Sequence, residues 1–288
     1  MNVRREWIGH GEERRDRIEA GLVARWAATL DVEVSPGLVP QAVHWCICVP
    51  DTPTSMLGAD GHPGTGSTGF LPPVAQPRRM WASSRMDFVR PLRLGEDICR
   101  RSAVTNIVEK TGASGTLVFV DATHETHGAD GLAIREVQTI VYRDPAPVSA
   151  QPPMAPSDSR LFTTFGWDTG RVLVPSETML FRFSALTFNS HRIHYDLPYA
   201  TGIEGYRGLV VQGPLTATLL IDLARREFGD QALTHFAFRG LSPAICGEAL
   251  HLVLRRSDRE VELGAFSAEG RPIMSAMGTL SDRVAQSK

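Results

Sequence analysis

The spacing of apolar residues along the chain predicts two long helices, one in each half. Between Glu12 and Thr29, apolar residues recur every three or four positions, which is the spacing of an amphipathic helix. The same spacing returns from Pro214 to Phe228, where leucines and alanines form one stripe. Each half of the chain therefore contains one candidate for a central helix.

Two blocks of alternating apolar and polar residues predict antiparallel strands. The first runs from Arg85 to Arg143, and the second follows the second helix and ends near Ser281. The turn Ala-Asp-Gly at 129–131 has a counterpart, Ala-Glu-Gly, at 268–270. The chain thus repeats one plan, a helix followed by antiparallel strands. We therefore predict an α+β double hot-dog fold, in which each module has a central helix wrapped by a curved antiparallel sheet.

Two stretches rich in proline and glycine interrupt these elements. Residues 144–158 are proline-rich and predict an extended linker. We therefore expect an N-terminal module at 1–150 and a C-terminal module at 151–288. Residues 58–77 predict a long loop. Apolar residues such as Phe70 within it favour an ordered loop that covers the protein.

Composition and charge exclude several classes of function. The 288 residues are 42% hydrophobic and 22% charged, with a net charge of −2, so no basic surface for nucleic acid is expected. Basic pairs such as Arg78-Arg79 are isolated and are interpreted as solvated surface. No apolar run reaches the roughly 20 residues that span a bilayer, and the charged N-terminus lacks the apolar core of a secretory signal. The four cysteines have no CxxC spacing, so we expect reduced thiols in a cytoplasmic protein.

The densest group of reactive side chains lies between Phe183 and Ala200. It contains Asn189, His191, Arg192, His194, Tyr195 and Asp196. Gln212 and Gly213 follow, immediately before the second predicted helix. A helix N-terminus carries unpaired N–H groups and a partial positive charge, and glycine allows an oxygen to approach its amide closely. An imidazole-rich loop facing such an amide is suited to proton transfer on an acyl thioester.

This segment resembles the MaoC-like (R)-hydratase family, whose motif is Asp-x-Asn-Pro-x-His-x-Asp-Pro-x-x-Ala, followed by His-Gly or Gln-Gly at the start of the central helix. Aligned without gaps, the catalytic His of the family falls on His194 and its oxyanion-binding Gly on Gly213. The catalytic Asp of the family is Asn189 here, and its Asn is His191. This altered version is similar to a narrower branch, which contains mitochondrial-type 3-hydroxyacyl-thioester dehydratases and bacterial itaconyl-CoA and mesaconyl-CoA hydratases.

The resemblance extends over nearly the whole chain. In the first half it is carried by HWCICVPDTPTSMLGADGHP, by GFLPPVAQPRRMWASSRMDFVRPLRLGE and by SGTLVFVDATHE. It implies a double hot-dog fold, an acyl-CoA substrate, no cofactor, and a catalytic loop in the C-terminal half alone. A homodimer is expected by analogy.

The Asn at position 189 changes the expected mechanism, because an amide cannot accept a proton at neutral pH whereas an imidazole can. We expect His194 to take a proton from water, Asn189 to orient that water, and the Gly213 N–H to hold the thioester oxygen. The expected substrate-binding residues are His191, Arg192, Tyr195, Asp196 and Gln212.

Several of these residues also have a structural interpretation. His191 either binds substrate or hydrogen-bonds its own loop. Arg192 either binds a substrate carboxylate or forms a surface ion pair, and Asp196 either orients His194 or caps a following turn. Tyr195 belongs either to the core or to the pocket wall.

In the first half, His44 and Trp45 are either a pocket wall or core, and His62 is expected in solvent. We expect no metal, because the pair His191 and His194 has no third ligand at a recognisable spacing.

The resemblance, together with the possibility that Arg192 binds a carboxylate, therefore implies a hydratase that converts itaconyl-CoA or mesaconyl-CoA to citramalyl-CoA. The alternatives are a 3-hydroxyacyl-thioester dehydratase of fatty-acid metabolism, a hot-dog thioesterase, and a non-catalytic acyl-CoA-binding module.

Overall fold

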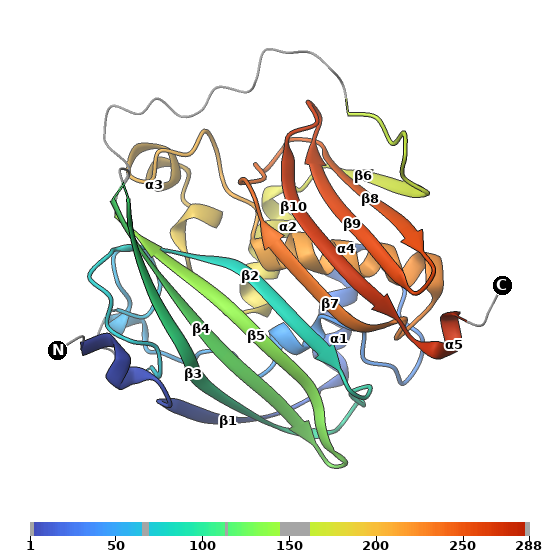
Figure 1. Cartoon of the computed structure of the whole chain (residues 1–288), viewed down its shortest axis with the longest axis horizontal. Helices are drawn as coiled ribbons and strands as arrows, with labels where there is room; N and C mark the ends of the chain where they lie inside the picture. Colours follow the sequence, from blue (N-terminus) through green and yellow to red (C-terminus); the bar gives the residue numbers. More distant parts are fainter. Residues whose placement is uncertain (1–2, 65–68, 113–114, 145–161, 286–288) are drawn as a thin grey trace.

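The fold is built on one large antiparallel sheet. The computed structural model describes residues 3–64, 69–112, 115–144 and 162–285. Within them, ten strands pair in the order β1-β3-β4-β5-β2-β7-β10-β9-β8-β6 (Figure 1). Beyond Asp144, the predicted linker lies outside the described residues.

The two halves of the chain contribute five strands each, in matching order. The N-terminal strands are β1 (Gly11–Arg17), β2 (Arg78–Phe88), β3 (Asp97–Gly112), β4 (Gly115–Gly128) and β5 (Gly131–Arg143). The C-terminal strands are β6 (Thr169–Leu173), β7 (Leu233–Gly240), β8 (Leu250–Ser257), β9 (Glu260–Ser267) and β10 (Pro272–Leu280). The half-sheets join where β2 pairs with β7, from Ser83 opposite Arg239 to Asp87 opposite His235. The repeat predicted from the turns at 129–131 and 268–270 is thus present, since both connect the last two strands of a half-sheet.

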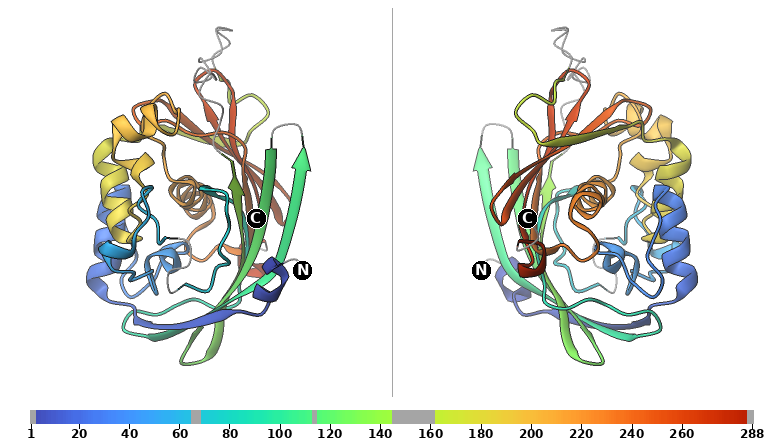
Figure 2. Two further views of the ribbon diagram at one scale, coloured as in Figure 1. Left: turned by 90° about the vertical axis from the view of Figure 1, so that its left-hand side faces the viewer. Right: turned by 90° about the vertical axis from the view of Figure 1, so that its right-hand side faces the viewer.

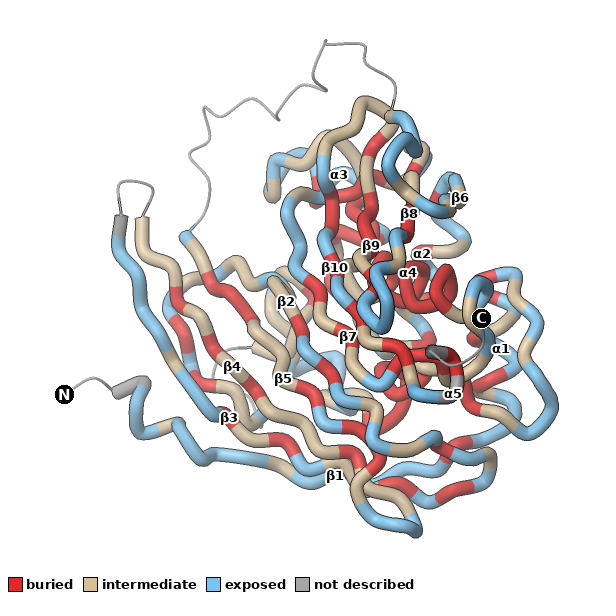
Figure 3. Tube along the Cα trace, turned by 45° about the vertical axis from the view of Figure 1, so that its right-hand side comes forward, coloured by how far each residue is buried: buried red, intermediate tan, exposed pale blue. Residues whose placement is uncertain are grey.

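The central helix of the C-terminal half is α4 (Gly213–Phe228), as its apolar spacing predicts. Every residue from Leu215 to Ala224 is buried, because the sheet curves around one side of α4 while two helices cover the other (Figure 2). These two are α1 (Ala20–Leu30) and α2 (Glu177–Leu186), which pack against each other. Figure 3 shows the buried residues gathered along α4 and the inner faces of the strands.

The remaining helices are short. They are α3 (Leu197–Gly202), α5 (Asp282–Ala285), and the 3-10 helices η1 (Val3–Trp7), η2 (Val43–Cys46), η3 (Thr54–Met56) and η4 (Arg192–His194). Across the described part of the chain, no helix is both long and apolar enough to cross a membrane.

The helix predicted from Glu12 to Thr29 is wrong in its first third. Residues 11–17 form β1, which pairs with β3, and the Glu13 carboxylate bonds Arg101 across the two strands at 3.1 Å. The apolar spacing begins only at Ile18, so the helix is confined to α1.

Nor does α1 occupy the position in the N-terminal half that α4 has in the C-terminal half. Residues 31–64 and 69–77 contain only short 3-10 helices, and repeated prolines, among them Pro36, Pro40 and Pro53, prevent a longer helix. This segment covers the inner face of the N-terminal half-sheet: the Trp45 indole donates to Glu136 on β5, and the Phe70 ring contacts His124 on β4.

Candidate functional site

A large cavity, about 2170 Å³ in volume, is lined by both halves of the chain. The C-terminal half contributes residues 187–191 and 193–195 and the start of α4, and the N-terminal half contributes residues 57–64 and the inner faces of β2, β4 and β5. This volume exceeds the ~300–1,000 Å³ of pockets for drug-sized ligands, so a bulky substrate can be accommodated.

His194 lies on this cavity and is attached to the chain that leads into α4. Its Nδ1 is 2.7 Å from the carbonyl oxygen of Val210, and the Val210 N–H donates to the Ile193 carbonyl at 3.0 Å. Because a carbonyl only accepts, Nδ1 carries the hydrogen and Nε2 is left as an acceptor. Burial lowers the pKa of His194 to about 4, against the raising effect of the Val210 hydrogen bond, so the ring is neutral at pH 7.

Gly213 is the first residue of α4 and lines the same cavity as His194. The nearest atom to a Cβ built on it would be the Trp81 carbonyl oxygen, at 3.9 Å, so the space beside its amide is open. The expectation that His194 and Gly213 converge on one cavity is met.

Asn189 and Gln212 both line the cavity, and one polar atom of each side chain is already hydrogen-bonded within the protein. The Asn189 Oδ1 accepts the His191 backbone N–H at 3.0 Å, which leaves its amide nitrogen as the available donor. The Gln212 amide nitrogen donates to the Leu180 carbonyl and the Ser184 hydroxyl, both at 2.9 Å. Gln212 therefore fixes the start of α4 against α2. Its buried Oε1 has no hydrogen-bond partner among the described residues.

Arg192 and Asp196 bind each other and do not line the cavity. Their ion pair measures 2.7 Å, and the guanidinium lies 4.1 Å from the centre of the Tyr199 ring. Asp196 caps α3, because it accepts the Tyr199 backbone N–H at 3.0 Å. The ion-pair and capping interpretations are thus correct for these two residues, and the assignment of both to substrate binding is not supported. Tyr195 is half exposed and lines the cavity wall.

The expectation that His62 points into solvent is wrong. Residues 59–62 dock onto the predicted catalytic loop: the Arg192 N–H donates to the Asp60 carbonyl and its guanidinium to the Ala59 carbonyl, both at 2.9 Å. The Ser190 hydroxyl donates to the Gly61 carbonyl at 2.6 Å. Gly61 has φ +86°, and a Cβ there would lie 2.0 Å from the Ser190 carbonyl oxygen, so only glycine allows this approach.

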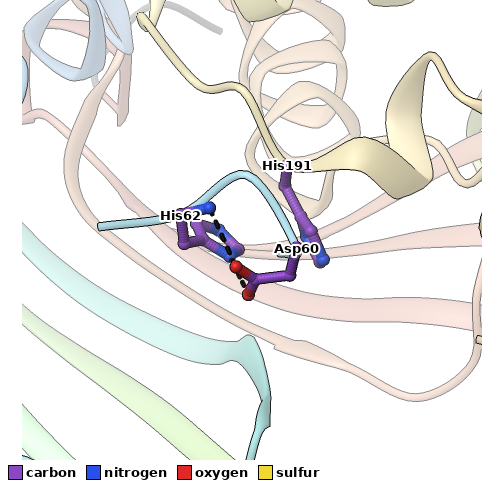
Figure 4. A group of neighbouring side chains, drawn as sticks. All are labelled: Asp60, His62 and His191. Carbon is purple, nitrogen blue, oxygen red and sulfur yellow. Dashed lines mark hydrogen bonds and ion pairs between the residues drawn. The ribbon is translucent and has the colours of Figure 1, made fainter. Parts of the chain in front are cut away.

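The docked loop brings Asp60 and His62 to His191 (Figure 4). The His62 Nδ1 is 2.9 Å from the Asp60 Oδ2, and the His62 backbone N–H donates to the Asp60 Oδ1 at 3.0 Å. The rings of His62 and His191 are 4.1 Å apart, and those of His191 and His194 are 5.5 Å apart. A carboxylate and three imidazoles from two distant segments therefore form one cluster.

The electrostatics of the cluster keep its imidazoles neutral. Burial lowers the pKa of His62 to about 4 and that of His191 to about 2, and neighbouring positive charge lowers both further. Burial alone would raise the pKa of Asp60, but its hydrogen bonds to His62 outweigh this and hold it well below its usual range. The cluster at neutral pH thus contains one carboxylate and three proton acceptors.

The donor atoms of Asp60, His62 and His191 lie within 4.8 Å of one another. The fold therefore supplies the third side chain that sequence spacing did not show, because its two additional members come from a loop about 130 residues earlier. Two neutral imidazoles and a carboxylate are suited either to proton transfer or to divalent metal binding.

The neighbouring residues Arg78 and Arg79 differ in their environment. Arg78 is neutralised by Glu204 at 2.9 Å. Arg79 stands opposite the buried Tyr142 on β5 and lines the cavity, and it forms no ion pair with any carboxylate of the described residues. Its charge contributes to the lowered pKa of His62 and His191, after the larger effect of burial. The interpretation of Arg79 as solvated surface is therefore wrong.

In the N-terminal half, Trp45 lines the cavity while its indole N–H donates to Glu136 at 3.1 Å, so it is both wall and structural contact. His44 is buried 3.6 Å from the same carboxylate and does not line the cavity. A polar band across the inner face of the N-terminal half-sheet also reaches the cavity wall; it comprises Arg100, His124, Glu136 and Gln138.

Comparison with known proteins identifies the family that this chain matches. Residues 42–246 match the family described as hydroxyacyl-thioester dehydratase type 2. The chain is 40% identical over 275 residues to the mesaconyl-C(4)-CoA hydratase of Chloroflexus aurantiacus, which covers 94% of this chain and 95% of the relative.

Solved structures agree on the fold. A MaoC-like dehydratase from Phytophthora capsici superposes with a TM-score of 0.70 at 13% identity, covering 97% of this chain and 98% of that one. A Mycobacterium tuberculosis protein with a double hot-dog fold superposes with a TM-score of 0.59 at 13% identity, covering 95% and 96%. The predicted double hot-dog fold is confirmed.

Proposed function

The chain belongs to the type 2 hydroxyacyl-thioester dehydratase family and is a hydro-lyase, and from this premise we propose that it hydrates a short branched dicarboxylyl-CoA thioester. Mesaconyl-CoA and itaconyl-CoA are the proposed substrates, and citramalyl-CoA is the product. In a mesaconyl thioester bonded through its unsubstituted end, the β-carbon carries a methyl group and a carboxylate. Water therefore adds directly beside a negative charge, and an enzyme for this reaction needs a cation next to its proton acceptors.

The choice of a dicarboxylyl substrate rests on the environment of Arg79. This residue lines the cavity near His62 and His191 and forms no ion pair within 4 Å among the described residues, although its charge helps to lower the pKa of Asp60. A guanidinium fits a carboxylate in a bidentate manner. Arg192, the candidate from the sequence, has its charge balanced by Asp196.

The proposed chemistry uses the start of α4 together with the imidazoles. The thioester oxygen accepts a hydrogen bond from the Gly213 N–H, where the helix N-terminus stabilises negative charge. Water is held by the unprotonated Nε2 of His194 and by the amide nitrogen of Asn189, and a neutral imidazole takes its proton as it attacks the β-carbon.

The test is an assay of the purified protein with mesaconyl-CoA and crotonyl-CoA, followed by loss of the enoyl-thioester absorbance, and with itaconyl-CoA, whose double bond is not conjugated with the thioester, followed by formation of citramalyl-CoA. Turnover of mesaconyl-CoA with a kcat/KM well above that for crotonyl-CoA is expected, because crotonyl-CoA has no carboxylate. Preference for crotonyl-CoA would contradict the proposal.

Three arginine variants sharpen this assay. Hydrogen bonds to charged groups contribute about 1.5–3 kcal/mol, so Arg79→Met should lower kcat/KM for mesaconyl-CoA by roughly 10- to 100-fold. The effect on crotonyl-CoA should be much smaller. Arg93→Met serves as the control, since it removes an exposed guanidinium that pairs with Asp130 and does not line the cavity. Arg192→Met also releases the Ala59 carbonyl, so it should lower turnover of mesaconyl-CoA and crotonyl-CoA alike; a loss confined to mesaconyl-CoA in this variant and absent from Arg79→Met would transfer the carboxylate to Arg192.

A dehydratase of fatty-acid metabolism is the second candidate, because the cavity continues over an apolar surface of the N-terminal half. Phe70, Leu71, Val74 and Ile140 belong both to the cavity wall and to a separate apolar cluster. Faster dehydration of long-chain 3-hydroxyacyl thioesters than of citramalyl-CoA would favour this candidate.

A further inference from the structure

The loop that carries His194 contains no carboxylate able to act on an imidazole in the cavity. Asn189 stands where the resembling family has its catalytic Asp, and Asp196 is committed to Arg192 and to the N-terminus of α3. An imidazole that accepts a proton becomes positively charged inside the protein, and a neighbouring carboxylate is the group that best stabilises this charge.

Only the N-terminal half brings a carboxylate to the imidazoles in the described cluster, and that carboxylate is Asp60. It lies 2.9 Å from the His62 Nδ1. We infer that His62 is the proton-transfer residue of the hydration reaction and that Asp60 is its positioning residue. This inference rests on the proposed function, since it assigns the proton acceptor for that reaction.

The three imidazoles differ in what would stabilise their protonated forms. His62 faces a full negative charge on Asp60, whereas His194 faces only the carbonyl dipole of Val210 at 2.7 Å. The His191 ring lies 4.1 Å from the His62 ring, tilted by 40°, and a protonated His62 would repel a charge on it. The hydrogen bond to Asp60 also fixes the tautomer of His62, because the carboxylate accepts from Nδ1 and leaves Nε2 free to take a proton.

The groups that act on His62 are Asp60 on its own loop, Arg79 on β2, and His191 and His194 on the facing loop. Arg79 opposes protonation of His62, and a substrate carboxylate bound to Arg79 would cancel part of this effect. Binding of the proposed substrate therefore makes His62 a better proton acceptor at the moment when one is needed.

The steps balance without any further reagent. Water gives one proton to the His62 Nε2 while its oxygen bonds to the β-carbon. The π-electron pair of the double bond moves to the thioester oxygen beside the Gly213 N–H. The His62 imidazolium then returns the proton to the α-carbon, which restores the carbonyl and the neutral enzyme.

Two variants test this assignment in the full chain. General acid–base groups contribute ~10²–10⁴ in rate, so His62→Gln should lower kcat on mesaconyl-CoA by at least about 100-fold. Asp60→Asn, which keeps the shape of the side chain, should lower kcat by about 10-fold or more. The matched controls are His235→Gln and Asp87→Asn, because this pair has a similar Nδ1-to-carboxylate contact of 2.8 Å, is more exposed and does not line the cavity. Thermal unfolding shows whether each variant is folded.

The pH profile separates a proton-transfer role from a structural one. The hydrogen bond and charge of Asp60 raise the pKa of His62, against the larger effect of burial. Asp60→Asn should therefore shift the acid limb of kcat/KM to lower pH as well as reduce the rate. A folded Asp60→Asn variant with full kcat and an unshifted limb would overturn the assignment.

Two further outcomes are distinguishable. If the wild-type protein turns over no enoyl-CoA, the proposed function is wrong, whatever the activities of the variants. Activity that disappears with a chelator and returns with Zn²⁺ would make Asp60, His62 and His191 a metal site and would also overturn the assignment of His62 as proton acceptor.

Discussion

The two halves of the chain build matching half-sheets but place different structures against them. The C-terminal half fills its sheet with α4, whose residues 215–224 are all buried. The N-terminal half covers its sheet with an irregular segment between residues 31 and 77 that carries no long helix in its described residues. A packed helix leaves little free volume over its sheet. The irregular segment instead leaves a cavity, and its residues Asp60 and His62 line this cavity together with Arg79 of β2. The C-terminal half thus supplies the helix N-terminus, and the N-terminal half supplies carboxylate and guanidinium.

Although the N-terminal half has no central helix in its described residues, it contributes side chains to the cavity wall beside those of the C-terminal half. The resemblance implied a catalytic loop in the C-terminal half alone. The cluster in Figure 4 instead combines His191 of that loop with two side chains from residues 60–62. Substitution of one glycine in each half tests whether both halves contribute to the site.

The largest effect is expected for Gly213→Val in the C-terminal half. Loss of one oxyanion-hole donor costs about 10²–10³ in rate, and the branched side chain would occupy the open space beside the amide. Gly21→Val, in the first turn of α1 and away from the cavity, is the control for a branched residue near a helix N-terminus, since its Cβ would meet only the flexible Arg25 guanidinium. The measurement is kcat on mesaconyl-CoA. Near-normal activity of a folded Gly213→Val variant would show that the N-terminus of α4 takes no part in the mechanism.

A smaller but clear loss is expected for Gly61→Ala in the N-terminal half. The new methyl group would collide with the Ser190 carbonyl, so the loop must move and carry Asp60 and His62 away from His191. We expect kcat to fall by roughly 10- to 100-fold, within the range for misplaced acid–base groups.

Gly37→Ala is the matched control for this substitution. Gly37 has a similar φ of +77° and nothing within 4 Å of its Cβ, so it carries the backbone strain without the collision. Equal losses of activity in the two variants would show that the docked loop contributes nothing specific.

The smallest effect concerns stability between pH 7 and pH 6. Burial lowers the pKa of His62 and His194 to about 4 and of His191 to about 2, below the usual histidine value of ~6.5 in the unfolded chain. The unfolded state then binds more protons, so stability should fall as the pH falls, by somewhat less than ~1 kcal/mol per imidazole over this interval.

Thermal unfolding of wild-type protein and His62→Gln at pH 7 and pH 6 measures this effect. The variant should lose about a quarter of the pH dependence, because burial also lowers the pKa of a fourth imidazole, that of His124. A wild-type unfolding temperature that rises toward pH 6 would show that these imidazoles are protonated in the folded protein.

Sequence patterns predicted regular structure well and the composite cluster poorly. The α4 stripe, the strand blocks and the turns at 129–131 and 268–270 follow from periodicity, which depends on local sequence alone. The segment from Glu12 was wrong because its charged residues pair across strands β1 and β3, a contact with residues almost 90 positions away. His62 was missed because neither glycine nor imidazole in a loop indicates where that loop docks.

One signal could have found the cluster from sequence. The absence of a carboxylate at Asn189 predicts that another segment supplies one, and Asp60 lies two residues before His62 in the part of the first half that resembles the same family. The domain division at 150, the cytoplasmic location and the homodimer stay predictions, and the roles of His194, Asn189 and Gly213 stay proposals.

A structure of the Asp60→Asn variant with bound citramalyl-CoA tests most directly whether both halves form one active site. We predict the thioester oxygen within about 3 Å of the Gly213 nitrogen, as in other oxyanion sites, the carboxylate on Arg79, and the hydroxyl group beside His62 and His194. An acyl group bound away from α4, or a carboxylate on Arg192 with His62 out of reach, would contradict the account.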